Sequence, residues 1–162
     1  MTVKILALNR YAEKDGAMEP LQKAELIPGR GIAENRLKNP ERQVCILTEA
    51  ARNWMALQEE KGLCFEKVKE NMLLDGPVER GGKLAFGDAV LQVGFAEKFC
   101  FAACVHGQNT AICPLREGMF FANVLQGGAV GVGDDGDVVA GCTNAVRKTP
   151  AACGRHPLYK RG

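Results

Sequence analysis

The sequence LAFGDAVLQVGF, residues 84–95, places one short apolar run on each side of a Gly-Asp step. In the second run, Val90, Gln92 and Gly94 alternate with Leu91, Val93 and Phe95. Alternation of this kind is typical of a half-buried strand, and Gly-Asp between two such runs indicates a turn. Three further runs are separated from one another by a pair of glycines, residues 127–128, and by another Gly-Asp step, residues 133–134. We therefore predict strands over residues 84–86, 89–95, 120–125, 130–132 and 137–140.

The N-terminal part of the chain continues the strand pattern and contains one clear helix. Strands are predicted over residues 3–8, 23–27 and 42–48. Thr48 can cap a helix, Glu49 suits its first turn and Gly62 is a natural terminator. The apolar residues expected to share the core-facing side of this helix are Ala50, Trp54 and Leu57. Because no strand–helix–strand alternation is present, the pattern favours a mainly β barrel or sandwich over a Rossmann-like sheet.

Length and charge restrict the class of protein. The chain has 162 residues and a formal net charge of +2, which indicates one domain and argues against nucleic-acid binding. The sequence has no apolar run of membrane-spanning length and no secretory pattern, so we expect a cytoplasmic protein without a membrane partner. The seven cysteines then fit a reducing compartment. We expect a domain over residues 1–140 and a basic extension over residues 141–162.

A cluster of cysteines is the strongest chemical signal. Cys100 and Cys104 are followed by His106 and Cys113. Together these four side chains could hold a structural zinc ion, although the spacing of the second pair is irregular. Alternatively, Cys100 and Cys104 are reactive thiols or small buried residues. On the reactive-thiol hypothesis, Lys98 is the nearest cation in sequence to Cys100.

Five arginines are scattered between the predicted strands. If the barrel gathered some of them at one mouth, their planar guanidinium groups would suit an anionic ligand. Surface solvation is the alternative for most of them. These residues are Arg30, Arg36, Arg42, Arg80 and Arg116.

The order of short motifs resembles the MOSC domain, the module found at the C-terminus of molybdenum cofactor sulfurases and as stand-alone bacterial proteins. The resemblance covers about residues 1–139. The motifs are, in order, residues 25–27 with 31–32, Arg42-Gln43-Val44, Glu70-Asn71, Phe86-Gly87-Asp88, Cys100, Arg116-Glu117-Gly118, residues 124–128 and residues 132–134. The Cys-x₃-Cys pair followed by Arg-Glu-Gly is most similar to the stand-alone bacterial branch.

The resemblance implies a closed, antiparallel-rich β-barrel of complex topology with a few peripheral helices. It also implies binding of molybdenum cofactor, or transport of sulfur as a cysteine persulfide. A thiolate is soft enough for either role. Cys100 would then be the thiolate and the ligand of molybdenum, with Cys104 as a second thiol. The expected partners are a cysteine desulfurase or a molybdoenzyme, and the expected chemistry is sulfur transfer or molybdenum-dependent redox. The cofactor contacts would come from Arg42, Asn71, Lys98 and Arg116.

Three positions depart from the family pattern. Glu34, Asn35 and Leu37 stand where family members usually have Gly, Asp and His. The departure favours a second hypothesis, a non-catalytic binding or accessory module on the same barrel. The zinc site is the third hypothesis.

Overall fold

The structure is a computed structural model, and it describes residues 1–13, 16–37, 39–95, 104–108 and 113–140. The strands are β1 (Thr2–Arg10), β2 (Glu19–Leu21), β3 (Lys23–Ile27), β4 (Gly31–Ile32), β5 (Val44–Thr48), β6 (Met72–Leu74), β7 (Lys83–Phe86), β8 (Ala89–Val93), β9 (Met119–Gln126), β10 (Gly128–Gly131) and β11 (Asp135–Val139). The helices are α1 (Glu49–Leu57), the 3₁₀ turn η1 (Phe65–Lys67), α2 (Val105–Gln108) and α3 (Pro114–Gly118).

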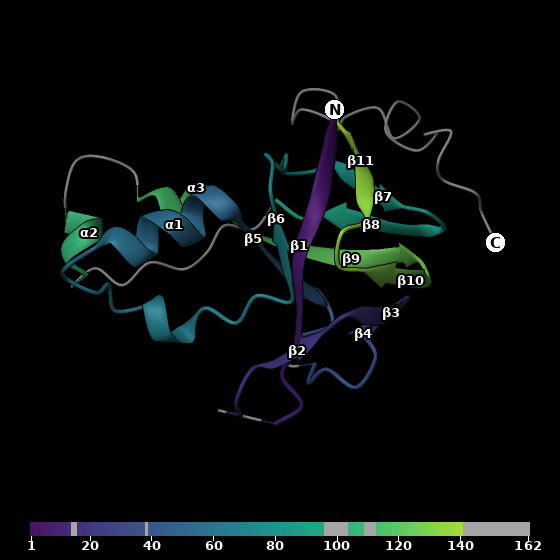
Figure 1. The fold of residues 1–162 in the computed structure, drawn as a ribbon, viewed down its shortest axis with the longest axis horizontal. Coiled ribbons are helices and arrows are strands. Elements are labelled where there is room, and N and C mark those ends of the chain that lie inside the picture. The colour runs from purple at the N-terminus through teal and green to yellow at the C-terminus, as the bar shows by residue number, and fades with distance from the viewer. Residues whose placement is uncertain (14–15, 38, 96–103, 109–112, 141–162) are drawn as a thin grey trace.

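Seven of the described strands close into a barrel. Their order is β11-β7-β8-β9-β5-β6-β1, and β1 pairs back onto β11. Six of these seven contacts are antiparallel, while β5 and β6 run parallel. A small sheet of β10, β3 and β4 lies at one end (Figure 1). The predicted closed, antiparallel-rich barrel is confirmed.

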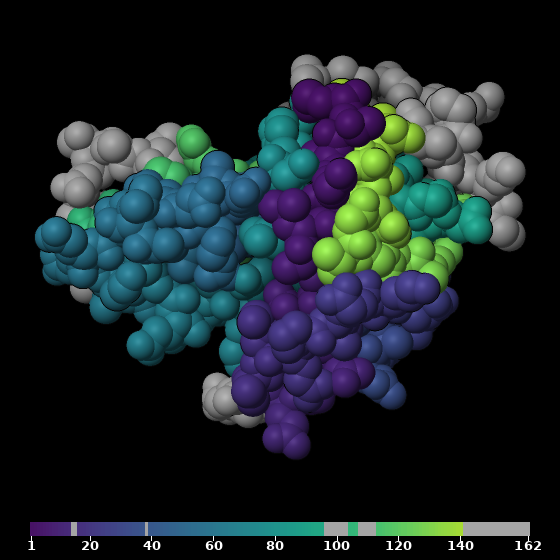
Figure 2. Space-filling view, viewed as in Figure 1, coloured from purple at the N-terminus to yellow at the C-terminus, as the bar shows by residue number. Residues whose placement is uncertain are grey.

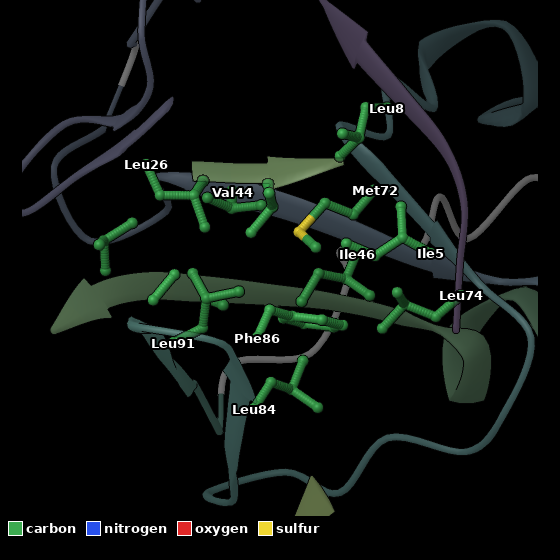
Figure 3. Close-up of a cluster of buried hydrophobic side chains, with 14 of the residues drawn as sticks. Ile5, Leu8, Leu26, Val44, Ile46, Met72, Leu74, Leu84, Phe86 and Leu91 are labelled. Carbon is green, nitrogen blue, oxygen red and sulfur yellow. The ribbon is translucent and has the colours of Figure 1, made fainter. Parts of the chain in front are cut away.

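The barrel interior is filled by apolar side chains. Strands β1, β5, β6, β7 and β8 alternate so that one set of residues points inward. Figure 3 shows ten of these side chains converging: Ile5, Leu8, Leu26, Val44, Ile46, Met72, Leu74, Leu84, Phe86 and Leu91. All ten are at most 2% exposed, so this is a dry packed core and not a channel.

Three short helices lie together beside the barrel (Figure 1). They cover a second apolar cluster that includes Leu47, Met55 and Leu115. No helix in the described part of the chain is long and apolar enough to cross a membrane. We refer to α1, α2, α3 and η1 together as the helical lobe.

Helix α1 begins as predicted but ends early. The Thr48 side-chain oxygen accepts a hydrogen bond from the backbone N–H of Ala51 at 3.3 Å. The helix ends at Leu57 and not near Gly62, because the Gln58 side chain donates to the Trp54 carbonyl at 3.0 Å. That bond satisfies a carbonyl that the next helical turn would otherwise have used.

The predicted buried face of α1 is wrong by one position. Ala51 and Met55 are buried, Trp54 is partly buried, and Leu57 is 80% exposed. The reason is the close approach of α3: a Cβ atom on Gly118 would come within 2.5 Å of the Ala51 Cβ. This contact selects the face, and helical periodicity alone did not identify it.

Candidate functional site

A pocket of about 380 Å³ opens between the barrel and the helical lobe. Its walls come from the end of β1, the segments before β5 and β6, and the start of β9. Figure 2 shows the surface hollowed between the teal residues that follow α1 and the purple and blue residues around β2 and β4. The lining residues are Tyr11, Glu13, Asn35, Arg36, Asn39, Arg42, Gln43, Cys45, Lys67, Lys69, Asn71, Met119 and Phe121.

The pocket is strongly cationic. Of its described lining side chains, Arg36, Arg42, Lys67 and Lys69 are positive and only Glu13 is negative. Arg36, Arg42 and Lys67 are exposed and Lys69 is half-buried, so the charges lie where a ligand from solvent can meet them. Positive side chains gathered around a concave surface raise the local concentration of anions.

Two aromatic rings hold two of these cations against the pocket wall. The guanidinium carbon of Arg42 lies 4.6 Å from the centre of the Phe121 ring. The ammonium nitrogen of Lys69 lies 5.7 Å from the centre of the Tyr11 ring. Such cation–π contacts contribute about 0.5–1 kcal/mol at exposed sites. They restrict two long side chains that would otherwise move freely in solvent.

Buried asparagines lie at the floor of the pocket, where Asn35 and Asn71 line it, and beneath the floor, where Asn9 supports them. Asn9, Asn35 and Asn71 are all less than 9% exposed. The Asn71 Oδ1 accepts from the Cys45 backbone N–H at 3.0 Å, and its Nδ2 donates to the Asn9 carbonyl and to Asn35 Oδ1, both at 3.2 Å. Asn35 Oδ1 also accepts from the Tyr11 N–H at 2.8 Å. We call these three residues the asparagine network.

The asparagine network is flanked by one ion pair. Asn9 donates its side-chain N–H to the Glu70 carbonyl at 3.3 Å. The buried Glu70 carboxylate in turn pairs with Arg52 of α1. These contacts attach the helical lobe to the segment that carries Lys69 and Asn71.

The thiol in the pocket is protonated at neutral pH. Cys45 is buried, and desolvation raises the pKa of its thiol from 9.0 to about 12. Burial also raises the pKa of the Tyr11 hydroxyl, and the charge of an ionised Cys45 raises it further. The charge of Arg52 lowers it. Cys45 is therefore a poor nucleophile near pH 7.

The structure brings together two of the predicted site residues, Arg42 and Asn71. Arg116 lies on α3, is exposed, and does not line the described pocket; its carbonyl accepts from Arg80 at 2.8 Å. Cys104 is buried just before α2 and is likewise not a lining residue. Lys98 and Cys100 lie outside the described residues, as does the predicted basic extension over residues 141–162.

The histidine of the zinc hypothesis has another role. His106 Nε2 lies 2.8 Å from the Glu60 carbonyl, and its ring stacks on Phe65 and meets the edge of Trp54. Within the described ranges, no three or more His, Cys, Asp or Glu side chains lie close enough to hold a metal ion. Because Cys100 is outside those ranges, the complete zinc set is not described.

Several residues of the pocket were absent from the predicted site. Lys67, Lys69 and Asn71 alternate with Val68, which packs in the helical lobe, and with buried Glu70. Alternation in extended chain places every second side chain on one side. That pattern could have identified Lys69, whereas Lys67 is the last residue of η1. Of the five scattered arginines, the barrel gathers Arg36 and Arg42 here.

Comparisons of sequence find no relative. No protein-family model matches the chain. No curated protein matches it significantly. The fold is therefore compared through solved structures.

Solved structures with a similar fold are found. One is the YuaD protein from Bacillus subtilis, with a TM-score of 0.61 and 17% identity over 86% of this chain and 97% of that chain. YiiM from Geobacillus stearothermophilus has a TM-score of 0.53 and 18% identity over 85% and 74%. YiiM from Escherichia coli has a TM-score of 0.54 and 17% identity over 87% and 72%. YiiM is a MOSC-domain protein, and this chain has a MOSC-like fold.

Proposed function

We propose that the protein binds the molybdenum cofactor, or a ligand of the same chemistry, in this pocket. The observation that carries the proposal is the gathering of four cations and two aromatic rings around one cavity of about 380 Å³. The cofactor has an anionic phosphate and a flat pterin ring system. Guanidinium groups bind phosphate through paired hydrogen bonds, and lysines add point charge.

The parts of the cofactor fit the pocket unequally. Arg36, Arg42, Lys67 and Lys69 would hold the phosphate, while Phe121 and Tyr11 offer faces or edges to the pterin. Cys45 is buried in the pocket wall, and burial raises the pKa of its thiol to about 12, so it is not the thiolate that we propose for sulfur chemistry. When bound, the cofactor would supply redox or sulfur chemistry at molybdenum. The thiolate we propose for that metal is Cys100, with Cys104 as the second thiol.

The proposed cellular role is cofactor sulfuration or delivery. On this role, a cysteine desulfurase would load Cys100 with a persulfide, or a molybdoenzyme would receive the cofactor. Lys98 and Arg116 are the remaining proposed cofactor contacts. Arg116 does not line the pocket, so we expect its replacement to affect cofactor binding less than replacement of Arg42.

Co-purification tests the proposal. The protein is expressed in a host that makes molybdopterin, and the bound pterin is oxidised and quantified by fluorescence. We expect Arg42→Gln to lower the pterin content about tenfold, the loss expected for one charge-assisted contact. The pterin content of Arg42→Lys should lie between those of the wild type and Arg42→Gln, because lysine keeps the charge and loses the planar guanidinium group. Lys23→Gln is the matched control, since Lys23 is exposed on β3 away from the pocket. Wild-type protein that carries no pterin contradicts the proposal.

A binding or accessory module without cysteine chemistry is the second candidate. The departure from the family pattern at Glu34, Asn35 and Leu37 favours it, and the structure places Asn35 in the lining of the pocket. The two candidates differ at Cys100. A Cys100→Ser variant that retains pterin but no longer accepts persulfide from a desulfurase supports sulfur transfer. Retention of pterin with no persulfide even on the wild type supports the binding module.

A further inference from the structure

Tyr11 lines the pocket, and its hydroxyl group makes no hydrogen bond to any residue that the structure describes. Its backbone, in contrast, is engaged: the N–H donates to Asn35 Oδ1 and the carbonyl accepts from the Arg36 N–H, both at 2.8 Å. Within the described ranges, no side-chain nitrogen or oxygen atom is both shielded from solvent and unpartnered, so this hydroxyl is open to water. A ligand in the pocket can take the place of that water.

The amide side chains near Tyr11 have already used their hydrogen-bonding groups. The side chain of Asn71 makes three hydrogen bonds to the protein, and that of Gln43 makes two. The Asn35 Oδ1 accepts two more. The Cys45 thiol also lines the pocket, but a thiol is a weaker donor than a hydroxyl. The Tyr11 hydroxyl is therefore the neutral group best suited to bind a ligand at the floor.

The hydroxyl keeps its proton at neutral pH. Burial raises the pKa of Tyr11 above its ordinary value of 10.0, and the charge of an ionised Cys45 raises it further, while Arg52 lowers it. A protonated phenol donates to neutral acceptors such as a ring carbonyl or a ring nitrogen. The exposed Arg36 and Arg42, by comparison, carry the full charges that attract a phosphate. The pocket thus offers charge for one part of a ligand and a neutral donor for another.

We propose that Tyr11 is a specificity-determining residue of the pocket: its hydroxyl donates a hydrogen bond to a carbonyl or nitrogen on the flat ring of a phosphate ligand. The inference rests on the proposed function, because it requires that the cations hold the phosphate of the ligand. The substrate class is then narrower than aromatic phosphates in general. A ring without acceptors would displace water from the hydroxyl and leave it unpaired, which costs affinity.

Two probes that differ in the ring test this specificity. Hydroxymethylpterin phosphate carries a ring carbonyl and ring nitrogens, whereas benzyl phosphate has a flat ring and a phosphate but no acceptor on the ring. Titration calorimetry measures the Kd of both. We expect the wild type to bind the pterin probe more tightly than benzyl phosphate.

Tyr11→Phe is the decisive variant, because it removes one oxygen and keeps the ring beneath the Lys69 ammonium. It should weaken the pterin probe about fivefold, as expected for the loss of one neutral hydrogen bond, and leave the Kd of benzyl phosphate unchanged. Arg42→Gln is the matched control for the charged part of the pocket, and it should weaken both probes about tenfold. A purely structural role of Tyr11 would weaken both probes alike, so the difference between the probes separates the two roles.

Each other outcome overturns a stated part of the argument. If Tyr11→Phe weakens both probes equally, or neither, the specificity role is wrong, and the proposed function stands as long as Arg42→Gln weakens both. A Tm of Tyr11→Phe well below that of the wild type would show that the hydroxyl bonds within the protein, which also overturns the role. If the wild type binds neither probe, the proposed function fails and the inference fails with it.

Discussion

Replacing Asn71 by alanine should destabilise the protein far more than the loss of one surface amide. Asn71 is 4% exposed, and its side chain bonds the Cys45 N–H, the Asn9 carbonyl and the Asn35 Oδ1. The variant leaves all three groups without that partner in a buried place. Each unsatisfied buried group costs about 1–3 kcal/mol.

The expected loss of stability lies at the lower end of the summed cost for these three groups. Asn35 Oδ1 keeps its hydrogen bond from the Tyr11 N–H, so it loses only one of its two hydrogen bonds. We therefore expect Asn71→Ala to lower the free energy of unfolding by about 3 kcal/mol. A chain of this size loses about 2–4 °C in Tm for each kcal/mol, so the Tm should fall by roughly 10 °C.

Urea unfolding followed by tryptophan fluorescence measures this loss. Trp54 is the single tryptophan, and it packs against the second apolar cluster in the helical lobe. Asn53→Ala is the matched control, because Asn53 is exposed on α1 and alanine favours a helix. A loss below about 1 kcal/mol at unchanged denaturant slope would refute the structural role that we assign to Asn71.

Three further predictions concern the helical lobe and the buried thiol. Thr48→Ala removes the α1 cap and should lower the free energy of unfolding in urea by about 1 kcal/mol. Thr48→Ser keeps the hydroxyl and should lower it little. Equal losses in the two variants would contradict the capping role. Gly118→Ala should destabilise by about 1–3 kcal/mol, because its Cβ would lie 2.5 Å from the Ala51 Cβ, and no loss would show that α1 and α3 are free to separate. Cys45, with its pKa raised to about 12, contributes stability that is complete below pH 9 and is lost as the pH rises from 9 towards 12, since only the unfolded thiol ionises there. Stability of the wild type should therefore fall more steeply than that of Cys45→Ala above pH 9, and parallel pH curves would contradict this.

Strands with a strong two-residue pattern could be predicted from the sequence. The run over residues 23–27 coincides with β3, and the Gly-Asp steps lie between β7 and β8 and beside β11. The strands that were missed are short: β2, β4 and β6 have two or three residues each. Segments of this length carry no measurable period, because their pairing comes from neighbouring strands. The parallel pairing of β5 with β6 could not be predicted for the same reason.

The candidate site could be predicted only in part, for a different reason. Arg42 and Asn71 were identified through motif order, and the idea that arginines gather at one mouth holds for Arg36 and Arg42. Tyr11 and Phe121 were missed because nothing in their local sequence distinguishes a pocket wall from a core. Their role depends on Lys69 and Arg42, which approach them across the fold.

The arrangement of charge in the pocket also explains why its floor is made of amides. A carboxylate or imidazolium among the buried residues would need an ionic partner, because desolvation of a lone charge costs several kcal/mol. Asparagine supplies donors and acceptors without that cost, so Asn9, Asn35 and Asn71 can connect three segments and remain neutral. The cations then lie above the floor, where water solvates them until a ligand arrives. A single substitution that charges one of these buried asparagines should therefore harm stability more than one that charges the exposed Asn39 at the rim.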